Sequence, residues 1–189
     1  FEGVVLGLSG GIDSAFTSYI CTKALGPEKV TNVMMPTKFT SRESLDLAKE
    51  LCENLESNYI IHPIDKIFEN FESSLQQEMG NIQFDTADEN LQARIRANIL
   101  MYYSNKFNWL LVSTGNKSEI AVGYCTLYGD TCGGKNIPGD LLKVQIYEIC
   151  KWINRKKEII PKGIITRPPT AELRKNQKDS DSLPPYEIL

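Results

Sequence analysis

The sequence has no apolar run of the roughly 18 residues that a membrane-spanning helix needs. Its first residues also lack the basic segment followed by an apolar segment that marks a signal peptide. Lys and Arg together number 21, against 24 Asp and Glu, so the net charge of −3 offers no overall attraction for duplex nucleic acid. We therefore expect a cytoplasmic protein that binds neither a membrane nor a nucleic acid.

Cysteine and histidine are too few and too scattered to suggest metal or disulfide chemistry. The five cysteines are odd in number and contain no CxxC pair, which argues against a zinc site and a disulfide framework. The single histidine, His62, has no serine or cysteine nucleophile motif beside it, so we interpret it as structural. The 189 residues, with 41% hydrophobic side chains, are enough for one globular domain with a sizeable core.

Strand-like and helix-like apolar patterns alternate along most of the chain. We expect strands at 4–8, 30–35, 58–61 and 109–113. We expect helices from 12 to 20, from 41 to 55, from 64 to 77 with a break at 80–85, from 86 to 105 and from 140 to 154. Thr40–Glu43 and Thr86–Glu89 resemble capping boxes, Asp140 is a candidate cap, and no strand or helix is supported after Pro161. The alternation predicts an α/β fold: a mostly parallel, doubly wound sheet with helices on both faces and ligand sites beyond the carboxyl ends of its strands.

A glycine- and serine-rich turn joins the first predicted strand to the first predicted helix. It consists of Gly7, Leu8, Ser9, Gly10, Gly11, Ile12, Asp13 and Ser14. Glycines allow backbone N–H groups to converge on an anion, the helix N-terminus adds a favourable dipole, and two hydroxyls supply donors. Because Asp13 would repel a phosphate in this cradle, the turn implies a bound magnesium ion. The lysine of a P-loop and the GxGxxG spacing are absent, and an ordinary strand–helix turn is the structural alternative.

This turn resembles the SGGxDS pyrophosphate-binding loop of the ATP pyrophosphatase superfamily, whose members adenylate a carboxylate or carbonyl and then admit a nitrogen nucleophile. Further blocks resemble NAD synthetase over nearly the whole chain. They are Glu89–Arg96, Ser113–Glu119, Tyr128–Asp130, Asp140–Lys143, Pro168–Leu173 and Asp181–Tyr186. The resemblance implies an adenine nucleotide alpha-hydrolase-like fold. It also implies that residues 1–189 are one synthetase domain, which we interpret as a fragment of a longer protein.

The resemblance assigns roles to individual residues. ATP is expected to contact the Gly7–Ser14 turn together with Arg96, Thr114, Lys143 and Thr170. Deamido-NAD is expected to contact Asn90, Arg94, Glu119 and Asp130. Magnesium is expected at Asp13 and Glu119, and the expected catalytic residues are Asp130, Lys143 and Thr170. Asp130 would position or deprotonate ammonia.

The two arginines also have a purely structural interpretation. Arg94 and Arg96 lie about 200° apart around a helix, so they cannot serve one ligand together and should reach different sites. The guanidinium fork suits a phosphate or carboxylate at either site. Alternatively, each arginine is an exposed helix charge that pairs with Asp88 or Glu89.

The other candidate residues have structural alternatives as well. Glu119 fits a helix N-terminus, where the dipole stabilises a carboxylate. Lys143 could be exposed and paired with Asp140, although a cation in a first helical turn opposes the dipole and so suggests an anionic ligand. Asp130 could close an Asx turn, and Thr170 could be an ordinary loop hydroxyl.

The activity that the resemblance implies is an AMP-forming amidation, in which deamido-NAD, ATP and ammonia give NAD, AMP and pyrophosphate. Leu127 in place of a lysine, and the lack of an aspartate near Gly134, depart from the ammonia-dependent pattern and favour the synthetase domain of a glutamine-dependent enzyme. A glutaminase domain or partner would then supply ammonia, and no such domain lies within these residues. The resemblance also implies a homodimer.

Two other functions remain open on the sequence alone. Another amidating member of the superfamily, such as GMP synthetase, shares the turn, but the blocks at 90–96 and 168–186 argue against it. A non-catalytic module that binds ATP or deamido-NAD fits less well with the joint presence of Asp13, Glu119 and Lys143. A sensor need not position a metal and a leaving pyrophosphate.

Overall fold

The computed structural model describes residues 1–80 and 83–189, and these form a five-stranded sheet flanked by helices. The strands are β1 (Gly3–Gly7), β2 (Val30–Met34), β3 (Asn58–Ile61), β4 (Trp109–Ser113) and β5 (Lys135–Asn136). The helices are α1 (Ile12–Leu25), α2 (Arg42–Leu55), α3 (Asp65–Met79), α4 (Thr86–Phe107), α5 (Lys117–Ala121), α6 (Lys143–Ile153) and α7 (Lys162–Thr166). Short 3-10 turns cover Pro27–Lys29 and Asp179–Asp181. Part of the break predicted at 80–85, residues 81–82, lies outside the described residues.

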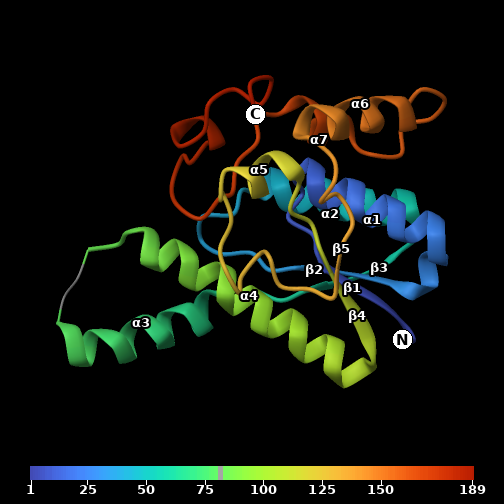
Figure 1. Cartoon of the computed structure of the whole chain (residues 1–189). Coiled ribbons are helices and arrows are strands. Elements are labelled where there is room, and N and C mark those ends of the chain that lie inside the picture. Colours follow the sequence, from blue (N-terminus) through green and yellow to red (C-terminus); the bar gives the residue numbers. More distant parts are fainter. Residues whose placement is uncertain (81–82) are drawn as a thin grey trace.

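Neighbouring strands of the sheet run parallel, in the order β3-β2-β1-β4-β5. Helices α1 and α2 cover one face, α6 and α7 pack outside α1, and α4 together with α3 covers the other face (Figure 1). The predicted parallel, doubly wound α/β sheet is therefore confirmed. The chain winds from β1 outward to β3 and then returns to β4 on the other side of β1. This reversal places a switch point at the carboxyl ends of β1 and β4, where ligands bind in such sheets.

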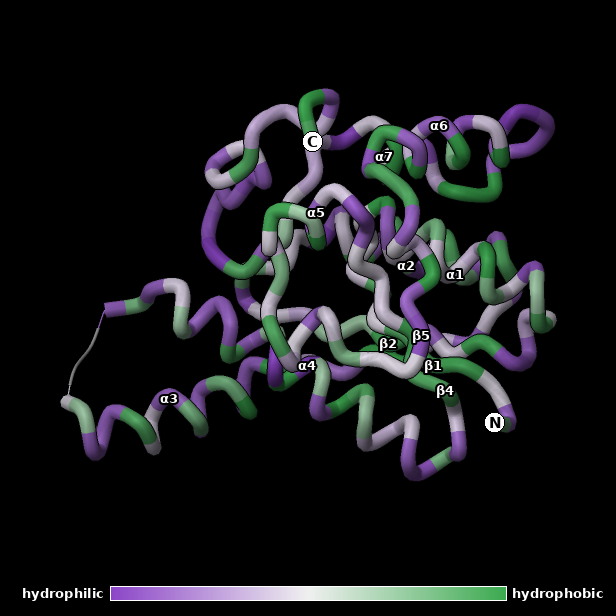
Figure 2. Tube along the Cα trace, in the orientation of Figure 1, coloured by the Kyte–Doolittle hydropathy of each residue, from purple (hydrophilic) through white to green (hydrophobic). Residues whose placement is uncertain are grey.

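Apolar side chains fill the space between the sheet and both helical layers. Hydrophobic residues concentrate along the central strands and the inner sides of the helices (Figure 2). All five cysteines are free thiols, as expected from their spacing. Burial raises the pKa of Cys21 to about 11 and the pKa of both Cys52 and Cys150 to about 12, so these three thiols stay protonated in the core. No helix in the described part of the chain is long and apolar enough to cross a membrane.

Three predicted helix starts are shifted in the structure. The observed caps of α2, α4 and α6 are Ser41, Asp85 and Leu142, in place of the predicted Thr40, Thr86 and Asp140. The Ser41 hydroxyl accepts the Ser44 N–H at 3.1 Å, and the Asp85 carboxylate accepts the Ala87 N–H at 2.7 Å. Each of these bonds satisfies a backbone N–H of the first helical turn. Ser, Thr and Asp are all good capping residues, so the sequence by itself did not decide which of several neighbouring polar residues caps each helix.

Several short elements were not predicted. The expectation that no helix follows Pro161 is wrong, because α7 begins directly after it and buries Ile164. A helix of five residues is too short for apolar periodicity to reveal, and α7 depends on its packing against α1 and α6. Strand β5 has only two residues and forms because Lys135 and Asn136 pair with the end of β4. Helix α5, like α7, has only five residues.

We predict that Leu6→Ala lowers the free energy of unfolding by about 2–5 kcal/mol, because Leu6 is fully buried in the central strand and its truncation leaves a cavity. Leu25→Ala is the matched control. Leu25 lies at the end of α1 with 41% of its surface exposed, so we expect a loss below about 1 kcal/mol. Urea denaturation followed by circular dichroism measures both changes. Similar losses for the two variants would contradict this description of the core.

Candidate functional site

The turn between β1 and α1 is held in shape by its own hydroxyl groups. Ser9 Oγ accepts the Gly11 N–H at 3.1 Å and lies 3.2 Å from Ser14 Oγ. Ser14 Oγ donates to the Gly11 carbonyl at 3.0 Å. Gly10 adopts a φ of +80°, and a side chain there would collide with the backbone oxygen of Ser44 in α2. The turn and the first residues of α1 line a cavity, which is the arrangement that an anion cradle requires.

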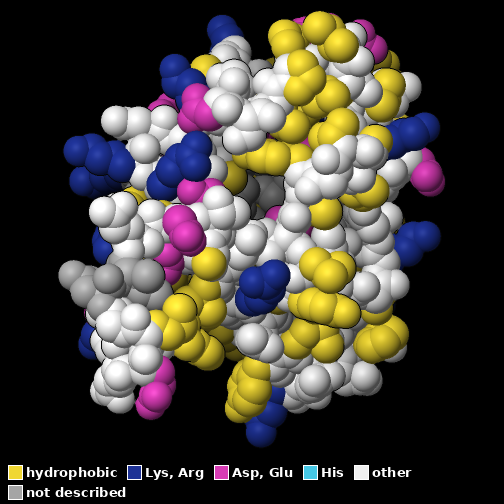
Figure 3. Space-filling view, turned by 60° about the vertical axis from the view of Figure 1, so that its left-hand side comes forward, with side chains coloured by type: hydrophobic (Ala, Val, Ile, Leu, Met, Phe, Trp, Pro, Cys, Tyr) yellow, Lys and Arg dark blue, Asp and Glu magenta, His cyan; other side chains and the backbone are white. Residues whose placement is uncertain are grey.

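Two cavities lie at the carboxyl ends of β1 and β4, and both have Ser9, Ser14, Thr114 and Asp130 in their walls. The larger, of about 410 Å³, also contains the first turn of α1, Glu119 and Lys143. The smaller, of about 260 Å³, is lined by apolar side chains from β2, α2 and α4, such as Met34, Ala48 and Leu100, together with Arg96. The space-filling view shows a hollow in the molecular surface bordered by hydrophobic side chains (Figure 3). Mostly apolar cavities with a few convergent polar groups are typical of small-molecule sites.

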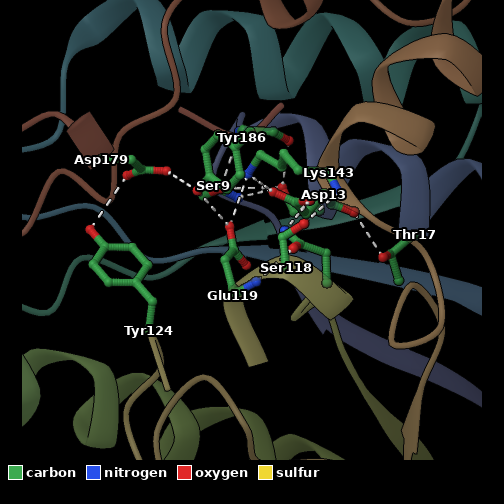
Figure 4. Close-up of polar contacts among 12 residues, drawn as sticks. Ser9, Asp13, Thr17, Ser118, Glu119, Tyr124, Lys143, Asp179 and Tyr186 are labelled. Atoms are coloured by element: carbon green, nitrogen blue, oxygen red, sulfur yellow. Dashed lines mark hydrogen bonds and ion pairs between the residues drawn. The ribbon is translucent and has the colours of Figure 1, made fainter. Parts of the chain in front are cut away.

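Lys143, the first residue of α6, is the centre of a buried ion cluster (Figure 4). Its ammonium donates to Asp13 Oδ2 at 2.5 Å and to Glu119 Oε1 at 3.0 Å, and only 4% of its side chain is exposed. Asp13 belongs to the first turn of α1 and Glu119 to α5, so the starts of three helices converge here. The Asn116 amide donates to Asp13 Oδ1 at 3.0 Å. The alternative of an exposed Lys143 paired with Asp140 is therefore wrong.

The charges of this cluster depend on one another. Burial by itself would lower the pKa of Lys143, but the Asp13 and Glu119 carboxylates outweigh it and raise that pKa above its usual range. Burial and the neighbouring Asp13 carboxylate raise the pKa of Glu119, and Lys143 opposes this shift. The lysine therefore stays protonated at neutral pH and holds together two carboxylates that would otherwise repel each other.

The two carboxylates have the chemistry that the predicted magnesium ion needs. Mg²⁺ prefers oxygen ligands and commonly combines one or two protein carboxylates with substrate phosphates. Among residues 1–80 and 83–189, no group of three or more His, Cys, Asp or Glu side chains is arranged to hold a metal ion. A cation beside Asp13 and Glu119 would therefore take further ligands from a bound phosphate. Its presence stays a prediction.

The two arginines of α4 point to different surroundings. Arg96 lines the smaller cavity, and its Nε donates to the Met35 carbonyl at 3.1 Å. Burial lowers the pKa of Arg96 to about 10, so it remains a cation at neutral pH, and none of the ion pairs formed by the described residues includes it. Arg94 is exposed, lines neither cavity, and donates from Nε to the Leu127 carbonyl at 3.2 Å. The Glu89 carboxylate, the alternative partner, pairs with Arg174 instead.

Asn90 and Asp130 meet at one turn. The Asp130 carboxylate accepts the Thr126 N–H at 2.9 and 3.1 Å, and the Thr126 hydroxyl donates to Asn90 Oδ1 at 2.8 Å. Asp130 is open to both cavities, yet partial desolvation by the surrounding protein raises the pKa of its carboxyl against the opposing effect of these N–H bonds. The structure therefore supports the turn-closing interpretation of Asp130 and also leaves its carboxylate within reach of a ligand.

The two threonines expected at ATP differ in their surroundings. Thr114 lies just beyond β4, in the walls of both cavities. Thr170 lines only the larger cavity, and its hydroxyl is engaged within its own loop, where it donates to the Gln177 carbonyl at 2.6 Å and accepts the Glu172 N–H at 3.2 Å. The loop-hydroxyl interpretation of Thr170 thus has direct support, and contacts of either threonine with ATP stay predictions.

Sequence reasoning missed the polar cover of the ion cluster, which comes from the C-terminal segment, residues 167–189. The Tyr186 hydroxyl donates to Asp179 Oδ2 at 2.7 Å and lies 3.3 Å from Glu119 Oε1, while its ring centre is 5.0 Å from Lys143 Nζ. The Tyr124 hydroxyl reaches the other oxygen of the buried Asp179 at 3.5 Å. No periodic pattern marks these residues, and the sequence singles out Tyr186 only as the last residue of the Asp181–Tyr186 block of the family resemblance.

A parallel, doubly wound sheet with a glycine- and serine-rich turn at its switch point defines the adenine nucleotide alpha-hydrolase-like fold. The sequence matches the NAD synthase family over residues 1–189, and the chain belongs to this family. The resemblance stated from the sequence is thereby confirmed.

Glutamine-dependent NAD(+) synthetases are similar to this chain. Those of Aquifex aeolicus and Thermotoga maritima are 51% and 50% identical over 189 and 191 residues. The alignments cover 100% of this chain and 33% of each relative, so the chain spans about a third of their length.

Solved structures of the same family share the fold. The glutamine-dependent NAD+ synthetase from Acinetobacter baumannii, in complex with ADP, has a TM-score of 0.86 at 43% identity and aligns with 100% of this chain and 34% of its own. The NMN synthetase from Francisella tularensis has a TM-score of 0.86 at 31% identity, over 95% of this chain and 71% of its own.

We predict that Lys143→Met lowers the free energy of unfolding by about 3 kcal/mol, because Asp13 and Glu119 then face each other without a cation. Combining it with Glu119→Gln should restore part of this loss, because one of the two repelling charges is removed. Urea denaturation of the two single variants and the double variant measures the coupling. A double variant no more stable than Lys143→Met alone would contradict the charge balance described here.

Proposed function

We propose that this chain catalyses the ATP-dependent amidation of deamido-NAD to NAD. In the first step the nicotinate carboxylate attacks the α-phosphate of ATP, which forms an acyl-adenylate and releases pyrophosphate. In the second step ammonia attacks the acyl carbon, AMP leaves and a proton is lost. The observation that carries the proposal is the cluster of Asp13, Glu119 and Lys143 beside the anion cradle, in a chain of the NAD synthase family.

The residues of the larger cavity would bind and orient the polyphosphate of ATP. The N–H groups at the start of α1 and the hydroxyls of Ser9 and Ser14 provide donors, and Lys143 provides a fixed positive charge. Thr114 and Thr170, which line the same cavity, would add contacts. A magnesium ion held by Asp13 and Glu119 would supply charge neutralisation for the phosphates. Holding both reactants in line accounts for much of the rate enhancement in transfers of this kind.

The second substrate would lie near the N-terminal half of α4, which contains Asn90 and Arg94. Asn90 and Asp130 meet there at the Thr126 turn, and Arg94 extends from the exposed side of the helix. A guanidinium at this rim suits a phosphate or carboxylate of deamido-NAD. The raised pKa of the Asp130 carboxyl makes it a better proton acceptor from ammonium than an ordinary aspartate.

Formation of NAD and pyrophosphate by the chain is the direct test. The mixture would contain the chain, magnesium-ATP, deamido-NAD and ammonium chloride at alkaline pH, and both products would be quantified. We expect Asp13→Asn to lower the rate by at least about 100-fold, because it removes a charge next to the polyphosphate. Asp46→Asn is the matched control, since Asp46 pairs only with the exposed Arg42 within the described structure, and it should match the unaltered chain.

Alternative acceptors and a purely binding role are separate arms of this assay. Because an NMN synthetase shares this fold at 31% identity, nicotinate mononucleotide replaces deamido-NAD in one arm, and xanthosine monophosphate replaces it in another. We expect deamido-NAD to give the highest kcat/KM. A higher kcat/KM for either alternative would show that this acceptor, and not deamido-NAD, is the preferred substrate. Measurable binding of deamido-NAD without pyrophosphate release would instead identify a non-catalytic module.

The nitrogen source is a further part of the proposal. The relatives named glutamine-dependent are about three times as long as this chain, which supports a glutaminase domain or partner as the source of ammonia. Comparing glutamine with ammonium chloride as nitrogen donor tests this point. We expect the chain by itself to use only ammonium.

We also propose that the chain forms a homodimer through the α3 arm. Helix α3 and the start of α4 extend from the body of the molecule (Figure 1), and α3 exposes Phe71, Leu75 and Met79. Exposed apolar stripes of this kind are typical of protein interfaces. We predict that Leu75→Glu converts the dimer to monomer in sedimentation velocity, whereas Ile188→Glu, at a more exposed site outside this arm, does not. A monomeric unaltered chain would contradict the proposal.

A further inference from the structure

Arg167, the residue that follows α7, joins three segments of the chain. Its Nη2 donates to the Gly10 carbonyl at 2.6 Å, and its Nη1 donates to Ser44 Oγ at 2.6 Å. Gly10 belongs to the anion cradle and Ser44 to the first turn of α2. The guanidinium therefore connects the C-terminal segment, α2 and the turn that precedes α1. Neither the sequence motifs nor the ion cluster accounts for this side chain.

The bond to the Gly10 carbonyl determines how the next peptide unit is oriented. In a trans peptide the carbonyl of one residue and the N–H of the next point in opposite directions. When Arg167 holds the Gly10 oxygen on one side, the Gly11 N–H is directed to the other, where it meets Ser9 Oγ at 3.1 Å. Gly10 has a positive φ and no side chain, so the peptide has little steric restraint of its own.

The guanidinium is itself held in place. Ser44 Oγ donates to Glu172 Oε1 at 2.7 Å, and Glu172 Oε2 accepts the Ser41 N–H at 3.2 Å. Ser44 can therefore accept from Arg167 while it donates to Glu172. This arrangement links the Glu172 carboxylate to the guanidinium through the Ser44 hydroxyl. The planar fork of an arginine suits a bridge between two fixed acceptors better than a lysine does.

We propose that Arg167 is a positioning residue for the anion cradle: by holding the Gly10 carbonyl, it fixes the peptide whose N–H donates to Ser9 Oγ, and so keeps Ser9 and the start of α1 in place for a bound pyrophosphate group. The proposal rests on the proposed function, since it takes the anion to be the pyrophosphate leaving group. Arg167 itself lines the larger cavity, and its two short bonds to the Gly10 carbonyl and Ser44 Oγ assign to it an effect on pyrophosphate release that is transmitted through the backbone.

Arg174, in the same C-terminal segment, provides a control because it is bonded to α4 and not to the cradle. Arg174 donates to Glu89 Oε1 at 2.8 Å, and the Leu173 carbonyl accepts from Gln92 Nε2 at 2.9 Å, so both bonds fasten the segment to α4. Arg174 lines neither cavity and has no bond to the cradle in the described structure. Arg174→Met therefore loosens the segment and leaves the Gly10 carbonyl bonded.

The test compares Arg167→Met, Arg167→Lys and Arg174→Met with the unaltered chain. Isothermal titration calorimetry measures the affinity for inorganic pyrophosphate in magnesium chloride, and the amidation assay measures kcat and the KM for ATP. We expect Arg167→Met to weaken pyrophosphate binding about tenfold and to lower kcat at least as much, with a smaller change in KM. Arg167→Lys should recover part of both losses, and Arg174→Met should stay within about twofold of the unaltered chain.

Each outcome decides the proposal. Equal losses for Arg167→Met and Arg174→Met would show that Arg167 only anchors the segment, and no loss for Arg167→Met would overturn the proposal outright. If Arg167→Met melts well below the unaltered chain, the pyrophosphate affinity and kcat of Arg167→Lys are compared with those of Arg174→Met. A larger loss for Arg167→Lys then supports the proposal, and equal or smaller losses overturn it. An unaltered chain that binds pyrophosphate in an Arg167-dependent way but forms no NAD would overturn the proposed function alone. Normal NAD formation by Arg167→Met would overturn only this inference.

Discussion

The site depends on one buried cation placed between two carboxylates. The side chains of Asp13, Glu119 and Lys143 come from the first turns of α1, α5 and α6, so their contact fixes the directions in which three helices begin. A lysine in a first turn opposes the helix dipole, and the two carboxylates compensate for this placement. The helix N-termini can therefore converge on one cavity without leaving a buried charge unpaired. That convergence is what makes the region beyond the sheet suitable for a polyphosphate.

The C-terminal segment is part of this site rather than an appended tail. Tyr186 covers the ion cluster and Arg167 contacts the cradle, while Arg174, outside both cavities, fastens the segment to α4. Because α1 and α2 lie on one face of the sheet and α4 lies on the other, these contacts connect both helical layers at the carboxyl edge of the strands. A ligand in the larger cavity would thus be enclosed by residues that are more than 100 positions apart, such as Ser9 and Thr170.

Structural features that depend on residues close together in the sequence could be predicted from the sequence. The strands at β3 and β4 and the long helix α4 follow from apolar periodicity, and the cradle follows from adjacent glycines and serines. Lys143 was correctly placed at a helix start, but its partners were not, because Asp13 is 130 residues away and only the folded sheet brings them together. The same reason applies to Arg167 and Ser44. Short elements such as α5 and α7 lack enough turns to show a period.

The distribution of positive charge at the two cavities bears on where the phosphates of a ligand would bind. The ammonium of Lys143 is already neutralised by carboxylates in the larger cavity, whereas the Arg96 guanidinium in the smaller cavity has no carboxylate at ion-pair distance among the described residues. A partly desolvated cation without a bonded counter-ion gains most from an anionic ligand. The two cavities therefore differ in what they offer to a ligand. Under the proposed function, Asp13 and Glu119 of the larger cavity would suit a divalent cation bound to a polyphosphate, and the Arg96 guanidinium of the smaller cavity would pair directly with an anion. Because both cavities have Ser9, Ser14, Thr114 and Asp130 in their walls, a single ATP extending across them would place its phosphates between these two cations.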